Sequence, residues 1–285
     1  MIDETAEEIR EMQTHSSSVV AVKAARALAS VANREYATVE EYLRALERNS
    51  TALRRANPSH ASLQTTQQDI VARVRAADPE TVEAAAERTR TVVETTIERV
   101  ESAKAAAAKR LADQLGNDVS LLTHDYSTTV LEALEVAAED GATLSVFATE
   151  ARPRHLGRKT ARRLGSVDGI DPTLIVDSAA GFYLEDCDAV VVGMDCIVGD
   201  TLYNRIGTYP IVATAADAGI PVYVAGSSAK IVDSGFRFEN DFRAGSEVIR
   251  EPPEGFTVEN PAYDATPLTL VDYLVTDEGL VEPDA

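Results

Sequence analysis

The chain is poor in several residue types, and each shortage limits what the protein can be. It has two cysteines, Cys187 and Cys196, and no tryptophan. No cysteine and histidine cluster stands beside either thiol, so we predict neither a disulfide framework nor a metal site, and we expect two reduced, buried thiols. No apolar run approaches the roughly 18 residues that cross a bilayer, and the N-terminus is acidic rather than signal-like. We therefore expect a soluble, cytoplasmic protein with no membrane contact.

Lysine is also scarce. The chain has 5 lysines among 27 basic residues, against 47 acidic residues, and its formal net charge is −20. Such a surface repels itself at low ionic strength and is screened within a few ångströms at molar salt, a pattern that resembles proteins of high-salt cytoplasms. A nucleic-acid duplex would be repelled unless basic residues clustered, so direct nucleic-acid binding is not expected. Two short basic clusters occur, Arg54-Arg55 and Arg152 to Arg163.

Glycine does not occur before Gly116. Apolar residues recur at helical spacing through this stretch, so residues 1–116 are predicted to form a helical N-terminal domain. Two signals mark helix starts inside it. Thr38 and Glu41 fit a capping box, and Pro79 is expected at a first helical position.

Beyond residue 116 short β-branched runs alternate with helix-length segments. Strands separated by single helices require crossover connections, so residues 117–285 are predicted to form a Rossmann-like α/β domain with a parallel, doubly wound sheet. The predicted strands are Val119–Thr123, Thr143–Phe147, Thr173–Val176, Ala189–Val192, Pro221–Val224 and a sixth run, Tyr273–Thr276; the predicted helices are 128–138, 156–164, 178–184 and 209–218. No GxGxxG follows any strand and no P-loop motif occurs, so we predict no cofactor.

Polar side chains follow several of the predicted strands at the point where each strand ends. They are Thr123–Ser127, Glu150–Pro153, Asp177-Ser178, Asp195 and Ser227–Lys230. The carboxyl ends of parallel strands meet at one edge of a sheet, where ligands bind in open α/β folds. Helix N-termini, arginines and a lysine at that edge would suit a phosphate or another anion. The alternative is a solvated polar edge with loose salt bridges.

Asp195 stands just past the predicted strand Ala189–Val192. A glycine-containing loop is expected to lead from it to Asn204 and Arg205, ahead of the next helix. This position makes Asp195 a candidate site carboxylate. Alternatively, Asp195 caps a turn and Asn204 begins a helix; spacing alone favours neither.

Several pieces of the sequence resemble, in order and spacing, the motifs of a known family. They are LLTHDYST, TEARPRHLGRK, LIVDSAAGFYLEDCDAVVVGMDCI, NRIGTYPIVATAADAGIPVYV and NPAYDATPLTLVDYLVTDEG, together with IREMQTHSSSVVAVKAARAL and LRRANPSHASL in the helical part. These pieces look like the eukaryotic initiation factor 2B alpha/beta/delta subunit family, which also contains methylthioribose-1-phosphate isomerase and archaeal ribose-1,5-bisphosphate isomerase. The resemblance covers essentially the whole chain. It implies a helical N-terminal domain, a Rossmann-like C-terminal domain and a homodimer or higher homo-oligomer.

The resemblance also suggests site residues. The isomerases carry a cysteine after a Thr-His pair and an aspartate in a Gly-Ala-Asp motif, and the matching positions here are Asp125 and Asp195. These two would be catalytic only in an isomerase. The Arg-Gly-Ala phosphate-binding turn of the isomerases matches Thr14–Ser17, so one expected arginine is missing. The candidate ligand-binding residues are Arg152, Arg158, Asn204, Arg205, which replaces the lysine of the family's Asn-Lys pair, and Lys230.

Two functions are compatible with these residues. Converting a 1-phosphorylated aldose to a ketose requires an acid to open the ring and a hydrogen transfer between C1 and C2, which one carboxylate cannot easily perform alone. The missing cysteine and arginine therefore favour a non-catalytic, initiation-factor-2B-like regulatory protein of translation initiation, which would sense a phosphorylated sugar or nucleotide and contact a translation factor. The alternative is an aldose–ketose isomerase of the ribose 1,5-bisphosphate type, with Asp125 in place of the cysteine.

Overall fold

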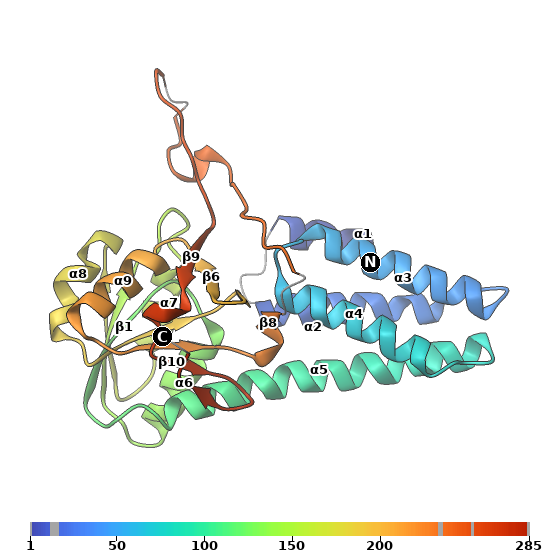
Figure 1. The fold of residues 1–285 in the computed structure, drawn as a ribbon, viewed down its shortest axis with the longest axis horizontal. Helices are drawn as coiled ribbons and strands as arrows, with labels where there is room; N and C mark the ends of the chain where they lie inside the picture. Colours follow the sequence, from blue (N-terminus) through green and yellow to red (C-terminus); the bar gives the residue numbers. More distant parts are fainter. Residues whose placement is uncertain (1, 12–16, 233–235, 252–253, 284–285) are drawn as a thin grey trace. The chain divides into compact units, whose positions relative to one another are not determined.

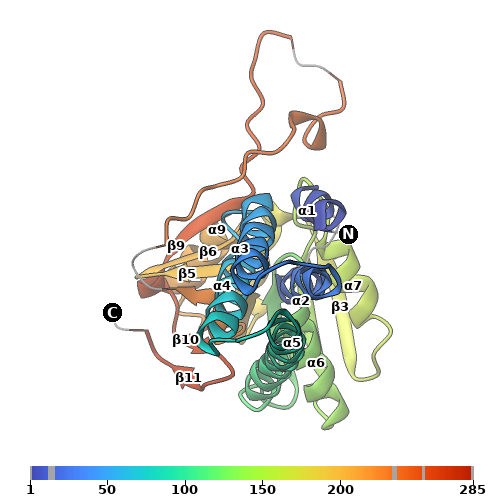
Figure 2. The ribbon, with the colours of Figure 1, turned by 90° about the vertical axis from the view of Figure 1, so that its right-hand side faces the viewer.

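The computed structural model describes residues 2–11, 17–232, 236–251 and 254–283, and the chain divides into two compact units, Met1–Ala103 and Lys104–Ala285 (Figure 1). The first unit is helical, as predicted. Figure 2 looks along its helices. They are α1 (Ile2–Arg10), α2 (Ser17–Ala29), the 3-10 turn η1 (Ser30–Asn33), α3 (Val39–Ala56), α4 (Ala61–Ala76) and the greater part of α5 (Val82–Ala112).

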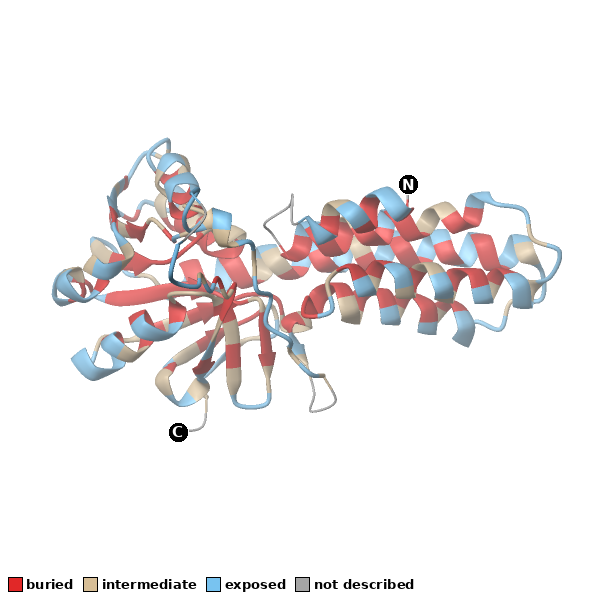
Figure 3. Cartoon of the chain, turned by 90° about the horizontal axis from the view of Figure 1, so that it is seen from above, coloured by how far each residue is buried: buried red, intermediate tan, exposed pale blue. Residues whose placement is uncertain are grey.

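Apolar stripes hold this helical unit together. Figure 3 shows buried residues running along the facing sides of the helices, and Leu28, Leu46 and Ile70 are fully buried among them. The threonine half of the capping box is confirmed, because Thr38 Oγ1 accepts a hydrogen bond from the Glu41 backbone N–H at 3.2 Å, while the Glu41 carboxylate accepts from the Ala37 N–H at 3.0 Å. The expectation for Pro79 is wrong. Helix α5 begins only at Val82, after Thr81, whose hydroxyl accepts from the Ala84 N–H at 3.1 Å and so satisfies a first-turn donor.

The second unit contains the predicted parallel sheet. Its seven strands lie in the order β11-β10-β7-β4-β1-β2-β3, and every neighbouring pair is parallel except β10 and β11. The strands are β1 (Val119–Thr123), β2 (Leu144–Thr149), β3 (Ile170–Ile175), β4 (Ala189–Gly193), β7 (Val222–Ala225), β10 (Tyr273–Val275) and β11 (Leu280–Val281). The main helices between them are α6 (Thr128–Glu139), α7 (Gly157–Leu164), α8 (Ala180–Tyr183, flanked by the 3-10 turns η2, Asp177–Ala179, and η3, Leu184–Asp186) and α9 (Thr208–Ala218).

Each face of this sheet is covered by its own core, because successive strand residues point to opposite sides. Leu121 packs in a cluster with residues of α5, α6 and α7, whereas Leu122 packs in a second cluster with residues of α8 and α9. In the same way Val191 belongs to the first cluster and Val190 to the second. Burial on both faces explains the continuous apolar runs that predicted these strands.

The last turns of α5 belong to this second unit. Leu111 is fully buried in the cluster under β1 and α6, and Lys104 forms an ion pair with Glu132 of α6 at 2.6 Å. The two compact units therefore divide within α5, at Ala103, whereas the sequence placed the boundary after the helix, at Gly116. Helical periodicity cannot reveal that one helix contributes to two cores.

A second, smaller sheet corrects the expectation for the segment after Asp195. That segment is a β-hairpin and not a loop: β5 (Cys196–Val198) pairs antiparallel with β6 (Thr201–Arg205) across a turn that contains Gly199. With β8 (Ile231–Val232) and β9 (Tyr263–Pro267) the hairpin forms a sheet in the order β8-β5-β6-β9. Asn204 and Arg205 thus lie on a strand, and the alternative that Asn204 begins a helix is wrong.

The stretch between β8 and β9 extends beyond both sheets (Figure 1). Its described parts contain the 3-10 turn η5 (Gly245–Glu247); two further 3-10 turns lie outside it, η4 (Ser228–Lys230) before β8 and η6 (Leu268–Leu270) after β9. Its base is held by backbone hydrogen bonds from Arg243 N to Asn260 O and from Ala262 N to Asp241 O, both 2.8 Å long. These bonds fix Arg243 and Asn260 next to the sheet edge. No helix in the described part of the chain is long and apolar enough to cross a membrane.

Candidate functional site

The candidate site lies where the strand order of the large sheet reverses. Strand β1 has β2 on one side and β4 on the other. The chain continues from β1 towards β2 and from β4 towards β7, so the two connections run in opposite directions and leave a crevice at the carboxyl ends of β1 and β4. Asp125 follows β1 and Asp195 follows β4. The two aspartates that the resemblance singled out therefore meet at the position where an open α/β sheet binds its ligand.

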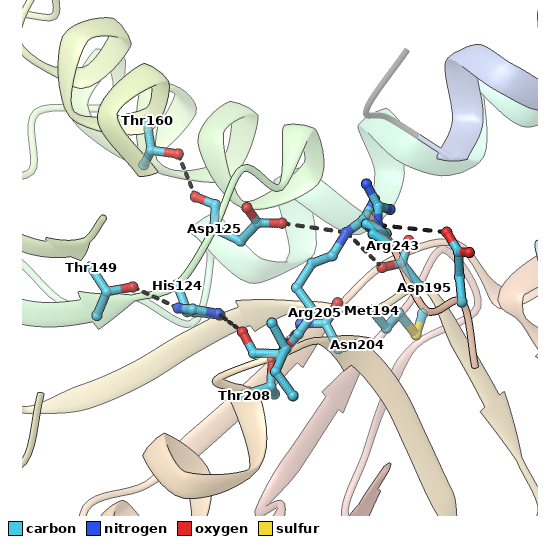
Figure 4. Close-up of polar contacts among 12 residues, drawn as sticks. His124, Asp125, Thr149, Thr160, Met194, Asp195, Asn204, Arg205, Thr208 and Arg243 are labelled. Atoms are coloured by element: carbon cyan, nitrogen blue, oxygen red, sulfur yellow. Dashed lines mark hydrogen bonds and ion pairs between the residues drawn. The ribbon is translucent and has the colours of Figure 1, made fainter. Parts of the chain in front are cut away.

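One arginine joins these two carboxylates (Figure 4). Arg205 Nε is 3.5 Å from Asp125 Oδ2 and 3.4 Å from Asp195 Oδ2. The three side chains are 11–16% exposed. Burial alone would lower the pKa of Arg205, but Tyr263, Asp195 and Asp125 together raise it above its usual value. The guanidinium also lies 4.9 Å from the centre of the Tyr263 ring, a cation–π distance.

The small sheet and the start of α9 position Arg205. Arg205 is the last residue of β6 and pairs directly with Tyr263 on β9. The Thr208 hydroxyl donates to the Arg205 carbonyl at 2.6 Å and receives a hydrogen bond from Asn204 Nδ2 at 3.0 Å. Asp264 accepts from the backbone N–H groups of Gly207 and Tyr209, at 2.7 and 3.0 Å, and so closes the turn into α9. Asn204 thus supports the turn from within the protein.

His124 ties β1 to the same turn (Figure 4). Its Nε2 is 2.8 Å from the Ile206 carbonyl oxygen, and its Nδ1 is 2.6 Å from Thr149 Oγ1. A carbonyl can only accept, so Nε2 carries the proton and Nδ1 accepts from the threonine hydroxyl. The ring leaves no space beside Gly207: a Cβ there would lie 2.7 Å from His124 Cε1. His124 therefore fixes the distance between Asp125 and the segment that carries Arg205.

Left-handed backbone conformations gather around this site. Asp125, Ala151 and His155 have φ values of 64°, 58° and 56°, which non-glycine residues rarely adopt. Thr160 Oγ1 donates to the Asp125 carbonyl at 2.6 Å, and the Asp177 carboxylate accepts from the Ala151 N–H at 2.7 Å. Such strain persists only where the surroundings enforce it, which is typical of functional sites.

Arginines dominate the cavity beside Asp125. Its space is small, about 30 Å³. The charged and amide residues that line it are Asp125, Arg152, Arg154, Arg205, Arg243 and Asn260. Burial lowers the pKa of Arg243, and the neighbouring charges of Arg205 and Arg154 lower it further, while Asp241 lies 3.5 Å away and opposes them. A concentration of positive charge in a chain of net charge −20 is a candidate anion site.

Two of the predicted ligand-binding residues, Arg158 and Lys230, do not line this cavity, although Lys230 lies next to Asp195. Arg158 Nη2 donates to Glu150 at 2.8 Å, and Arg158 does not line the cavity. Lys230 Nζ donates to the Met194 carbonyl at 2.7 Å; burial lowers the Lys230 pKa, although Asp195 opposes this. Thr14, His15 and Ser16, three residues of the segment matched to the Arg-Gly-Ala turn, lie outside the described residues.

Sequence reasoning missed His124, Arg154 and Arg243 as site residues. Two of them carried a signal. His124 belongs to the Thr-His pair quoted above, and Arg154 belongs to the basic cluster Arg152 to Arg163. Arg243 carried none, because it lies in an irregular segment more than a hundred residues after Asp125.

Comparisons with known proteins identify the family of this chain. Residues 13–283 match the Initiation factor 2 subunit family. The chain belongs to this family. The ribose 1,5-bisphosphate isomerase of Haloferax volcanii is 33% identical over 99% of this chain and 88% of that protein. The methylthioribose-1-phosphate isomerase of Acetivibrio thermocellus is 38% identical but covers 59% of this chain and 52% of that protein.

A solved structure of the Initiation factor 2 subunit family has the same fold. The crystal structure of the translation initiation factor eIF-2B of Pyrococcus horikoshii OT3 superposes with a TM-score of 0.84, at 25% identity, over 99% of this chain and 97% of that chain. The family assignment made from the motifs is therefore confirmed, and so is the predicted order of a helical part followed by a mostly parallel α/β part.

Proposed function

We propose that this chain binds an aldose phosphorylated on C1 at the β1 and β4 edge and isomerises it to the ketose, with ribose 1,5-bisphosphate as the first substrate to test. The observation that carries the proposal is the pair of carboxylates, Asp125 and Asp195, held on either side of Arg205 at the reversal of strand order. Relatives named ribose 1,5-bisphosphate isomerase span the whole chain, and they favour the isomerase over the regulatory function that the sequence ranked first.

The reaction needs one proton donor and one proton acceptor. A carboxylic acid gives its proton to the ring oxygen as the bond from that oxygen to C1 breaks. Hydrogen then moves with its electron pair from C2 to C1, so that C1 is reduced and C2 is oxidised. The C2 hydroxyl becomes a carbonyl and gives its proton to a carboxylate. Asp125 and Asp195 supply two carboxyl groups for these two roles, and Arg205 lies between them.

The test is turnover of ribose 1,5-bisphosphate by the purified chain in molar KCl, with ketose formation followed by NMR. Asp195→Asn should keep substrate affinity within a few-fold and reduce turnover by roughly 10² or more, the usual effect of losing a general acid or base. Asp200→Asn is the matched control, because this substitution removes the same charge at an exposed position of the hairpin turn. Turnover that survives Asp195→Asn unchanged would refute the catalytic role of Asp195.

A second candidate function is supported by one feature of the site. Asp125 occupies the position where the isomerases that this chain resembles carry a cysteine, and its carboxylate is already paired with Arg205. A site of this kind could bind a phosphorylated sugar or nucleotide without catalysis, in a cytoplasmic regulatory protein that forms homo-oligomers and contacts a translation factor. Binding of ribose 1,5-bisphosphate with no ketose formed by the wild-type chain would favour this function over the isomerase.

A further inference from the structure

Lys230 is the only buried lysine of the chain. It is 7% exposed, whereas the other lysines lie partly or fully at the surface: Lys23, Lys104, Lys109 and Lys159. Burial of an ammonium group is costly unless nearby groups compensate for the lost water. Burial lowers the pKa of Lys230, while the negative charge of Asp195 opposes this shift and the positive charge of Arg205 adds to it. A cation that the fold keeps inside at this cost, beside a site carboxylate, is a candidate for a functional role.

Lys230 holds the peptide unit that precedes Asp195. Its Nζ donates a hydrogen bond to the Met194 carbonyl oxygen at 2.7 Å. The N–H of the same peptide unit, which belongs to Asp195, donates to the Tyr203 carbonyl at 3.1 Å. Figure 4 shows Met194 and Asp195 beside Arg205. Rotation of this peptide plane would break both hydrogen bonds, so the direction in which the backbone projects the Asp195 side chain is fixed.

The turn that carries Lys230 is itself anchored. This turn is η4, and the Asp277 carboxylate accepts from the Ser228 N–H at 2.7 Å and from the Ser228 hydroxyl at 3.0 Å. Just before the turn, a Cβ on Gly226 would lie 2.7 Å from the Met194 side chain, so the segments that follow β7 and β4 are in close contact. Lys230 therefore reaches the Met194 carbonyl from a rigid support.

Lys230 acts on the site from outside the cavity. It does not belong to the residues that line the small cavity beside Asp125, and its hydrogen bond to Met194 is made to a backbone carbonyl. Its effect on a reaction in that cavity must therefore pass through the backbone of Asp195.

We propose that Lys230 is a positioning residue of the isomerase: by holding the peptide unit before Asp195, it keeps the Asp195 carboxylate at Arg205; this inference rests on the proposed function. A carboxyl group that exchanges a proton with the substrate must lie within hydrogen-bond reach of the reacting atom, and a displacement of about 1 Å can cost about 10² in rate. Lysine suits this task because one compact ammonium group on a slender stem reaches a single buried carbonyl, whereas arginine presents a broad, planar fork.

The experiment separates the placement of Asp195 from substrate binding. The kcat and KM for ribose 1,5-bisphosphate are measured with the full chain in molar KCl, with ketose formation followed by NMR. Lys230→Met keeps the length of the side chain and removes its hydrogen-bond donors. It should lower kcat by about 10- to 100-fold and leave KM within about threefold, because no residue that lines the cavity changes. Lys109→Met is the matched control, since it makes the same change on the exposed surface of α5.

A second measurement needs no substrate. In correlation spectra of the amide protons and nitrogens, the Asp195 resonance should shift in Lys230→Met, because the carbonyl of its peptide unit loses a hydrogen bond, and should stay in place in Lys109→Met. Lys230→Gln is uncharged, and its amide is one atom too short for the bond to Met194. It takes the place of Lys230→Met if that variant does not fold, with the same expected loss of kcat.

The outcomes distinguish this inference from the proposed function. If the wild-type chain forms the ketose and Lys230→Met loses less than about fivefold in kcat, Lys230 does not position Asp195, and the inference fails while the isomerase stands. The inference also fails if Lys109→Met loses as much as Lys230→Met, or if the Asp195 amide resonance does not move. If the wild-type chain forms no ketose, the proposed function fails and the inference fails with it.

Discussion

The link between Arg205 and its two aspartates makes a sharp prediction about stability. Arg205 is a cation whose side chain is only 13% exposed, with two aspartate partners at 3.4 and 3.5 Å. At such a distance one ion pair is worth about 5 kcal/mol in a medium of effective dielectric constant near 20, before the cost of removing the charges from water. Neutralising one aspartate leaves the arginine with the other, whereas neutralising both leaves it with no carboxylate at ion-pair distance among the described residues and only the weaker contacts of the Tyr263 ring and Asp241. The two substitutions should therefore not be additive.

We expect Asp125→Asn and Asp195→Asn each to lower the free energy of unfolding by about 1–2 kcal/mol, because each removes one of two partners. The double variant should lose about 4–7 kcal/mol, since removing the last partner of a buried charge costs about 3–5 kcal/mol. The coupling energy between the two sites is then about 2 kcal/mol or more, which is large for residues that act through a third side chain.

Urea denaturation followed by circular dichroism measures these values, at a constant molar KCl concentration that screens exposed charges more than buried ones. Adding Arg205→Met to the double variant removes the unpaired charge and should recover part of the lost stability. If the two aspartate substitutions add within about 0.5 kcal/mol, Arg205 does not couple the carboxylates and this reasoning is wrong. If Arg205→Met makes the double variant still less stable, the side chain contributes by packing and not by charge.

Two further predictions concern backbone space and salt. Gly207 has φ 104° and no room beside the His124 ring, so Gly207→Ala should lower the free energy of unfolding by about 2–4 kcal/mol, whereas Gly219→Ala, at φ 71° with open space, should lose only about 1 kcal/mol; equal losses in urea titrations would refute the role of the ring. The net charge of −20 should also abolish cooperative folding below roughly 0.5 M salt through carboxylate repulsion, and a circular dichroism signal that is indifferent to salt would contradict this.

The large sheet could be predicted because its physics is local. Val119–Thr123 was predicted with the bounds that the structure shows, because its central leucines, Leu121 and Leu122, form a short apolar run that is buried on the two faces of the sheet. The strand before Asp195 and the edge on which it ends were predicted for the same reason. Parallel order then followed from the helices between strands, and this order brought Asp125 and Asp195 to one edge.

The small sheet could not be predicted in this way. Strand β5 has three residues, and the partners of the hairpin, β8 and β9, are contributed by segments that follow α9. Cys196–Val198 and Thr201–Arg205 pair with each other across the two-residue turn Gly199-Asp200, a local hairpin signal that the sequence prediction did not use, whereas the pairing with β8 and β9 is non-local. The same non-local packing decides which arginines reach the cavity. Arg243 enters it through the irregular stretch before β9, whereas Arg158 turns to Glu150.

Two residues at the paired carboxylate site differ from those of the isomerases, and the two differences compensate for each other. In the isomerases that this chain resembles, a cysteine stands at the position of Asp125 and a lysine at the position of Arg205; here the two replacements lie 3.5 Å apart. An aspartate in place of the cysteine adds a second negative charge next to Asp195, in a site where the side chains are 11–16% exposed. A lysine presents one compact ammonium group, whereas the broad, planar guanidinium can lie between two carboxylates and also cover the Tyr263 ring. The second replacement therefore supplies the contact that the first one requires. The two replacements together leave two carboxyl groups at the edge of β1 and β4, so the site keeps groups that could act on a substrate although their chemistry differs from that of the isomerases. Turnover and binding must therefore be measured separately.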